Sequence, residues 1–105
     1  MGKKYDVVFA LAAAEDLDQI YRYISEELFA SQVAEGLMAK IEQSILHLGD
    51  YPYSCPIVSE ALVSRKKYHK LVVDRFIVFY TVNDAKKKVE IARVVYALRA
   101  YRDLL

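Results

Sequence analysis

Cysteine, histidine and glycine are scarce in this 105-residue sequence, and tryptophan is absent. The one cysteine, Cys55, cannot close an intrachain disulfide, so we expect a passive thiol in a reducing cytoplasm. The two histidines, His47 and His69, have no close ligand spacing, and no metal site is predicted. The scattered glycines form no phosphate-binding loop, and no serine lies in a nucleophile elbow. We therefore expect no cofactor.

A long hydrophobic run is also missing. No apolar segment approaches the roughly 18 residues that span a bilayer, so no membrane helix is predicted. Two lysines lie near the N-terminus, but no apolar stretch of roughly 7–15 residues with a cleavage site follows them, which argues against a signal peptide. The length fits one domain over residues 1–105 with a single modest core.

The chain as a whole is nearly neutral, with a formal net charge of +1, but its two halves differ. Residues 1–61 carry four Lys or Arg against ten Asp or Glu, a net charge of −6. Residues 62–105 carry eleven against four, a net charge of +7. This polarity predicts a basic C-terminal surface that meets an anionic partner. Mutual neutralisation of the two halves across the fold is the open alternative.

Three runs of β-branched and aromatic residues dominate the second half of the chain, at 71–73, 76–82 and 89–96. This composition favours strands. The breaks at 74–75 and 83–87 are short enough for hairpins, so the runs should pair antiparallel in sequence order. The middle run is apolar at nearly every position, which predicts a central strand that is buried on both faces.

The first half of the chain predicts a strand at 5–9 and then two helices. Apolar residues recur at helical spacing over 11–28 and again over 31–48. Ser31 is a candidate N-cap of the second helix, and Gly49 could end it in a left-handed conformation. Residues 51–64 read as a loop, and 97–105 as a short or frayed tail helix.

These elements predict an α+β fold. It has an N-terminal strand, an antiparallel helix pair, a three-stranded antiparallel meander and a short C-terminal tail helix. The first strand must join the meander to satisfy its backbone groups, which gives a four-stranded sheet.

A basic and aromatic group of residues is the remaining source of chemistry. Arg and Lys hold phosphates and stabilise a pentacovalent transition state, while His and Tyr transfer protons or stack on bases. The alternative is that the Arg65–Lys67 run is a solvated strand entry and that both histidines are structural. The group comprises Arg65, Lys66, Lys67, Tyr68, His69, Lys70, Arg75, Arg93, Tyr96, Arg99, Tyr101 and Arg102.

Three segments, in this order, resemble the RelE/ParE superfamily of type II toxin–antitoxin toxins, of the plasmid-stabilisation type. Residues 11–24, LAAAEDLDQIYRYI, are similar to the opening helix of the family. Residues 69–84, HKLVVDRFIVFYTVND, resemble its hairpin, and 89–105, VEIARVVYALRAYRDLL, its last strand and tail. The resemblance covers nearly the whole chain.

The resemblance implies a bacterial toxin with a cognate antitoxin whose C-terminal segment wraps it. RelE-like members are ribosome-dependent endoribonucleases that cut mRNA, whereas ParE-like members poison DNA gyrase. The target would therefore be gyrase or the ribosome with its mRNA, with no membrane involved. A homodimer and a heterotetramer with the antitoxin both stay open. We also expect an apolar groove between the helix pair and the sheet to accept an amphipathic antitoxin helix.

Matched position by position, the resemblance favours the ParE-like branch. Tyr96 and Arg99 match the C-terminal His/Tyr and Arg positions of the family, and Arg93 matches a common strand Arg. Ile77 lies where the nuclease branch has an Arg, and Ala100 replaces the usual Asp after the tail Arg. Losing that guanidinium would remove transition-state stabilisation.

The alternatives to gyrase binding are a metal-independent mRNA endonuclease and an inactive toxin homologue. For the nuclease, the predicted catalytic residues are Arg99, Tyr96, His69 and Arg75. For target or RNA binding, the predicted residues are Arg65, Lys66, Lys67, Lys70, Arg93 and Arg102.

Overall fold

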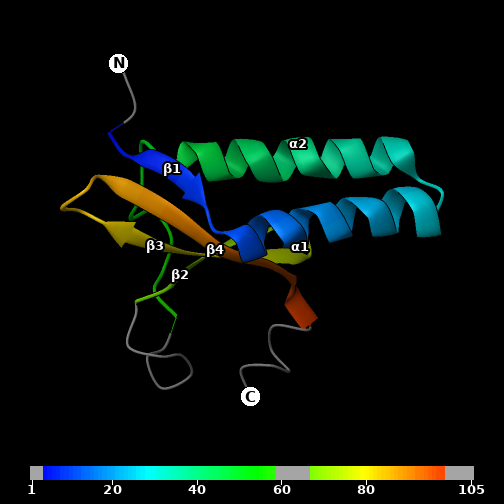
Figure 1. The fold of residues 1–105 in the computed structure, drawn as a ribbon. Coiled ribbons are helices and arrows are strands. Elements are labelled where there is room, and N and C mark those ends of the chain that lie inside the picture. Colours follow the sequence, from blue (N-terminus) through cyan, green and yellow to red (C-terminus); the bar gives the residue numbers. More distant parts are fainter. Residues whose placement is uncertain (1–3, 59–66, 99–105) are drawn as a thin grey trace.

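The computed structural model describes residues 4–58 and 67–98 and has the predicted α+β architecture (Figure 1). The order of elements along the chain is strand, helix pair, then three strands. The predicted tail helix falls mainly on residues 99–105, which lie outside the described residues. The elements are β1 (Asp6–Phe9), α1 (Leu11–Arg22), the π-helical turn η1 (Tyr23–Glu27), α2 (Ser31–His47), β2 (His69–Val73), β3 (Phe76–Asn83) and β4 (Lys88–Tyr96).

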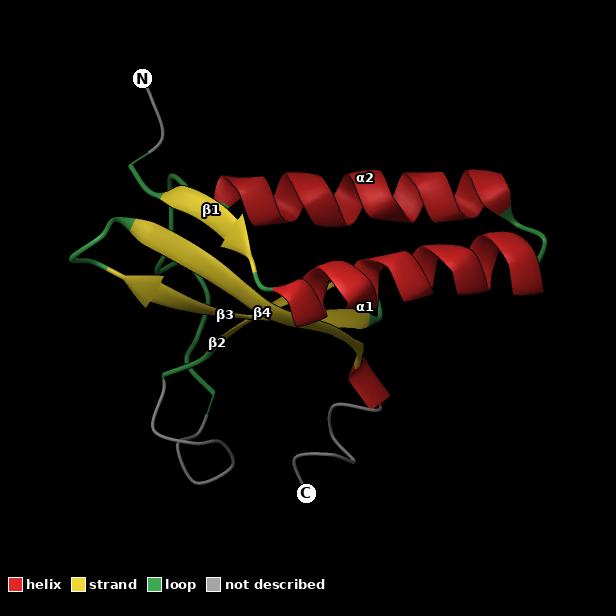
Figure 2. Cartoon of the chain, viewed as in Figure 1, coloured by secondary structure: helices red, strands yellow, loops and turns green. Residues whose placement is uncertain are grey.

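The four strands form one sheet in the order β1-β4-β3-β2. The meander of β2, β3 and β4 is antiparallel, as predicted, and β1 joins it parallel to β4. The first strand therefore pairs with the last, with Asp6 opposite Lys88. A bulge between Phe79 and Tyr80 shifts the register of β3 against β4. Figure 2 shows the two helices side by side over one face of this sheet.

The core lies between the helices and this face of the sheet. Neighbours in β3 point to opposite faces, and Ile77 and Val78 are both buried, at 3% and 0% exposure. The middle strand is thus buried on both faces at this point, in line with its apolar sequence. The buried cluster comprises Tyr5, Ala13, Ile41, Ile45, Leu48, Val73, Val78, Tyr80, Val89, Ile91 and Val94.

The ends of the helices differ from the sequence prediction. Regular α1 stops at Arg22, and the chain continues as η1, so the predicted 11–28 helix changes its hydrogen-bond pattern in its last turns. Ala30 takes the N-cap position of α2 and no side chain caps it, so the prediction for Ser31 was wrong. No described glycine has a positive φ, so Gly49 does not end α2 in a left-handed conformation.

The segment after α2 lies beside the edge strand β2. The Val58 amide donates to the Tyr68 carbonyl oxygen at 2.7 Å, and the Lys70 amide donates to that of Pro56 at 3.0 Å. A single bridge pairs Ile57 with His69. None of the helices in the described ranges combines the length and hydropathy needed to cross a membrane.

Candidate functional site

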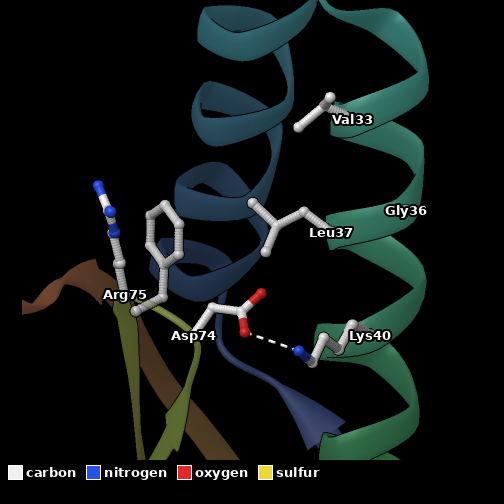
Figure 3. A pocket seen from close by; sticks show the side chains of 7 residues that line it. Val33, Gly36, Leu37, Lys40, Asp74 and Arg75 are labelled. Carbon is white, nitrogen blue, oxygen red and sulfur yellow. Dashed lines mark hydrogen bonds and ion pairs between the residues drawn. The ribbon is translucent and has the colours of Figure 1, made fainter.

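A groove follows the boundary between the helix pair and one end of the sheet. Its larger part, of about 820 Å³, lies between α1 with η1 and the ends of β3 and β4. Its smaller part, of about 560 Å³, lies between α2 and the β2–β3 turn (Figure 3). Arg75 and Phe76 line both parts, so the two hollows meet at these side chains. The hollow predicted between the helix pair and the sheet is therefore present.

The groove forms because the helices extend beyond the sheet. The 17 residues of α2 span about 25 Å, and the α1–α2 loop lies away from the strands in Figure 1. Ile20 and Leu37 still pack on the core, whereas Leu28 and Val33 continue the apolar stripes past the end of the sheet. The latter two are 54% and 63% exposed. The apolar lining is thus the part of each helix stripe that has no strand beneath it.

A tight turn positions Arg75 at the junction of the two hollows. Asp74 has a left-handed backbone, with φ of 52°, and its carboxylate accepts a hydrogen bond from Lys40 Nζ at 2.6 Å (Figure 3). The Arg75 carbonyl oxygen accepts from the Ala97 amide at 2.8 Å. The Arg75 side chain is exposed and has no ion-pair partner within residues 4–58 and 67–98. The groove therefore offers an uncompensated cation in an apolar setting.

Asp16 lies at the edge of β4 beside the groove, beyond the residues of β4 that pair with β1. Its carboxylate accepts from the Val94 amide at 2.9 Å and from two nitrogens of Arg93 at 2.7 and 3.0 Å. The Asp16 side chain is only 12% exposed, so these bonds replace most of its contact with water. Arg93, a predicted target-binding residue, is thus held by α1 in this structure.

The predicted catalytic residues do not all come together. Tyr96 lines the groove with Arg75, and its ring lies 5.8 Å from that of Phe76. His69 pairs with Tyr80 in the sheet, four residues along β3 from Phe76, or about 13 Å away. It is 5% exposed, and its Nδ1 donates to the Cys55 carbonyl oxygen at 2.8 Å. Its ring stacks on Tyr80, with centroids 4.9 Å apart. Arg99 lies outside the described residues.

The predicted binding residues are also distributed over the molecule. Lys70 and Arg93 both lie opposite Phe79 in the register, one on each neighbouring strand, so the three share a row on the sheet face that points away from the helices. Lys67 precedes β2. The structure leaves the other three, Arg65, Lys66 and Arg102, outside its described ranges.

A second polar cluster ties the β3–β4 turn to two distant segments, and sequence reasoning missed it. The Asp84 carboxylate accepts from the Tyr5 hydroxyl and, at 2.5 Å, from that of Tyr53. These two bonds, and then the charge of Lys87, hold the pKa of Asp84 below its usual value. The bond to Asp84 raises the pKa of Tyr53 to about 12. Residues 79 and 31 positions apart meet here, so no local pattern signalled the contact.

Within the described ranges, no group of His, Cys, Asp and Glu side chains has the arrangement of a metal site. The chemistry that the groove offers is recognition: apolar walls, one uncompensated guanidinium and two aromatic rings at the end of the sheet.

Solved toxin–antitoxin structures share this fold. A chain of the chromosomal ParDE system from P. aeruginosa aligns with a TM-score of 0.71 at 19% identity, covering 89% of this chain and 96% of that one. A chain of the archaeal RelE–RelB complex from Pyrococcus horikoshii aligns with a TM-score of 0.66 at 12% identity, covering 91% and 98%. For the intact E. coli RelBE complex the values are 0.56, 18%, 89% and 96%. At these identities the likeness establishes the fold alone.

Sequence comparison gives the family. A search of curated proteins finds no match to this chain. The family model described as the ParE toxin of the type II toxin–antitoxin system parDE matches residues 7–101, nearly the whole chain. The chain therefore belongs to the ParE toxin family of type II toxin–antitoxin systems.

Proposed function

We propose that this toxin inhibits growth by binding DNA gyrase rather than by cutting mRNA, and that a cognate antitoxin neutralises it by filling the groove. The family match supports the toxin role and the ParE side of the superfamily. The choice of target and the antitoxin contact are inferences from the residues of this chain.

The observation that carries the choice of target is Ile77. It stands where, by the resemblance above, a nuclease would place an arginine on the third strand. Its side chain is 3% exposed within β3, so it presents no group to a phosphate. His69 is buried, its ring is hydrogen-bonded to the chain and stacked on Tyr80, and it lies about 13 Å from the Arg75–Tyr96 end of the sheet. The described residues thus offer no convergent acid, base and phosphate-binding set, which favours binding over bond cleavage.

The groove favours an amphipathic helix from the antitoxin. Its walls are mostly apolar, which suits the anchor residues of a helix laid into a groove. Asp16, Lys40 and Asp74 each have a charged partner within the fold, whereas Arg75 has none among the described residues. An acidic residue on the antitoxin helix would pair with Arg75 while its apolar face covers Phe76. The structural neighbours are themselves toxin–antitoxin complexes, which supports this partner.

A basic face and the C-terminal segment complete the proposal as the surface for the target. Lys70 and Arg93 flank Phe79 on the sheet face opposite the helices. Because Asp16 holds Arg93 in this structure, Lys70 supplies the positive charge beside the Phe79 ring. A cation beside an aromatic ring suits an acidic protein surface, and it adds to the rate of association more than to raw affinity.

The deciding experiment measures gyrase and translation with the same toxin preparation. We expect purified toxin to inhibit ATP-dependent supercoiling by DNA gyrase and to leave mRNA intact in an in vitro translation reaction. In cells, induction should give filaments with an SOS response. Codon-position cuts in mRNA that disappear in Arg99→Ala would instead establish the nuclease, and absence of any growth arrest would establish an inactive homologue.

The antitoxin contact has its own test. A short open reading frame beside the toxin gene, with a DNA-binding N-terminal half and an amphipathic C-terminal half, should encode the partner. Coexpression should yield a complex that copurifies. Free toxin that elutes alone in the presence of this product would contradict the groove assignment.

A further inference from the structure

The tip of the helical hairpin carries an aromatic residue in an unfavourable conformation. Phe29, between η1 and α2, is 91% exposed, and its backbone has a φ of 51°. Left-handed backbone is rare for a bulky residue, because the Cβ atom is crowded against the main chain. Burial of the ring within the chain does not offset this strain, since the side chain meets mostly solvent.

The position of Phe29 is one where glycine is the usual residue. The Ala30 amide donates to the Ile24 carbonyl oxygen at 3.1 Å, which closes a seven-residue turn around the left-handed residue, one residue wider than the usual six-residue closure because the preceding turn is π-helical. The Leu28 amide donates to that of Tyr23 at 3.2 Å. These bonds fix the backbone of the turn, so the position from which the ring projects is defined. Helices usually end this way with glycine, which carries no Cβ penalty. The phenyl ring at this turn therefore destabilises the fold, and no packing within the chain offsets the cost. This indicates a contact of the ring outside the chain.

Other apolar side chains surround Phe29 at the tip. Tyr23 is 58% exposed, Leu28 54% and Val33 63%. We call Tyr23, Leu28, Phe29 and Val33 the tip patch; the first two and Val33 also line the groove, whereas Phe29 does not. An exposed aromatic side chain with apolar neighbours is the composition of a binding hot spot, and Figure 1 places the α1–α2 loop clear of the sheet.

The charge around the tip patch selects its partner. Residues 23–39 contain three glutamates, Glu26, Glu27 and Glu35, and no Lys or Arg. All three are exposed. A nucleic acid would be repelled, and so would a second copy that docked tip to tip. The groove favours a partner of the opposite charge, because Arg75 would pair with an acidic segment. A segment that suits the groove is therefore poorly matched to the tip.

We propose that the tip patch is a docking site for the protein target, in which Phe29 enters an apolar pocket with a basic rim. The inference rests on the proposed function only in taking that protein to be DNA gyrase. It adds a contact on the acidic half of the toxin to the sheet face already described, and Phe29 is the tip residue that belongs to the target contact and not to the groove.

Substitution of Phe29 gives a test in which loss of function is not a loss of folding. Phe29→Gly removes the ring and relieves the left-handed strain, so its Tm should be unchanged or raised by up to about 4 °C. Phe29→Ala removes the ring alone. Leu11→Ala, at a position that is 75% exposed at the start of α1, is the matched control for loss of an exposed apolar side chain. Each variant is purified as its complex with the antitoxin and then freed from it.

The measurements are affinity for purified DNA gyrase, growth arrest after induction, and copurification with the antitoxin. Both Phe29 variants should bind gyrase at least about 30-fold more weakly and arrest growth poorly, with antitoxin copurification unchanged. Leu11→Ala should stay within about twofold of the parent protein in all three.

The outcomes separate this inference from the gyrase assignment. If the parent toxin does not bind gyrase, the gyrase assignment fails, and the growth-arrest measurement then tests the tip patch. Loss of arrest in the Phe29 variants but not in Leu11→Ala would support the tip patch as the docking site for another protein target. Unchanged arrest overturns the inference. It is equally overturned if the variants keep gyrase affinity or if they lose the antitoxin instead.

Discussion

At the residue scale, Asp84 shows how one carboxylate holds three separate segments together. Tyr5 comes from the N-terminus and Tyr53 from the loop after α2, while Asp84 itself lies in the β3–β4 turn. The Tyr80 hydroxyl, from β3, also holds this loop by donating to the Pro52 carbonyl oxygen at 3.0 Å. The loop is therefore anchored by tyrosine hydroxyls rather than by apolar packing alone.

This arrangement makes stability depend on pH in acid. The pKa of Asp84 is lowered in the folded chain, chiefly by the tyrosine hydrogen bonds. The stabilisation is present above the unfolded pKa of about 4 and is lost as the pH falls through the lower folded value. We expect the Tm of the parent toxin to fall below about pH 4, and we expect this component to be missing in Asp84→Asn. Thermal unfolding between pH 7 and pH 2 measures it.

Asp50 provides the control for that experiment. It is exposed, and its carboxylate has no hydrogen-bond partner in the described part of the chain. Asp50→Asn should keep the acid slope of the parent toxin. An identical slope in the parent and Asp84→Asn would show that the Asp84 cluster does not control the acid dependence.

Arg75 is the residue through which the antitoxin contact is most directly tested. Because its side chain is exposed and lacks an ion-pair partner among the described residues, Arg75→Glu should change the free energy of unfolding by less than about 0.5 kcal/mol. Its affinity for the antitoxin should fall by at least tenfold, since a like charge then meets the acidic helix. Calorimetric titration of the two purified chains measures this. Lys70→Glu, on the opposite face of the sheet, should bind normally; equal losses in both would point to a general charge effect.

At the scale of elements, strands were more predictable than helix ends. The runs at 71–73, 76–82 and 89–96 correspond to β2, β3 and β4, because β-branched composition and short hairpins are local signals. The end of α1 was not predictable in this way. Its apolar spacing continues smoothly to Leu28, while the hydrogen bonds widen to the π pattern from Tyr23 onward.

The groove was predictable only in outline. An unpaired stretch of helix stripe could be inferred from the sequence, but the meeting of Arg75 and Phe76 with both helices depends on where the sheet stops. The buried position of His69 could not be predicted from the sequence either. Its role is set by Cys55 and Tyr80, which are brought beside it by the loop and the β2–β3 pairing.

The edge of β4 supplies the prediction at this scale. Asp16→Ala leaves the Val94 amide without its acceptor and removes two hydrogen bonds to Arg93, in a site that is largely shielded from water. We expect a loss of about 1–3 kcal/mol in the free energy of unfolding, measured by urea titration at constant m value. Asp18→Ala breaks an exposed pair with Arg22 on the same helix and should cost less than about 1 kcal/mol. Comparable losses would mean that the edge contact is no stronger than a surface pair.

At the scale of the whole molecule, neutralisation between the two halves of the chain is seen in part, while the anionic partner of a basic surface stays a prediction. Asp16 with Arg93, and Lys40 with Asp74, each join the acidic half to the basic half, so some of the charge is neutralised within the fold. The three glutamates near the tip and the exposed Arg75 remain directed outward at separate places. One small domain thus presents surfaces of opposite sign at separate places.

The pairing of β1 with β4 means that the sheet can be completed only late in synthesis. Asp6 pairs with Lys88, which is synthesised 82 positions later. Because ribosomes add roughly 5–20 residues per second, the time between the synthesis of the two residues is on the order of 4–16 s. Until then the newborn polypeptide lacks the strand that joins β1 to the meander, and with it one wall of the groove. A chain truncated before this point would contain β1 without the strand that it pairs with in the sheet.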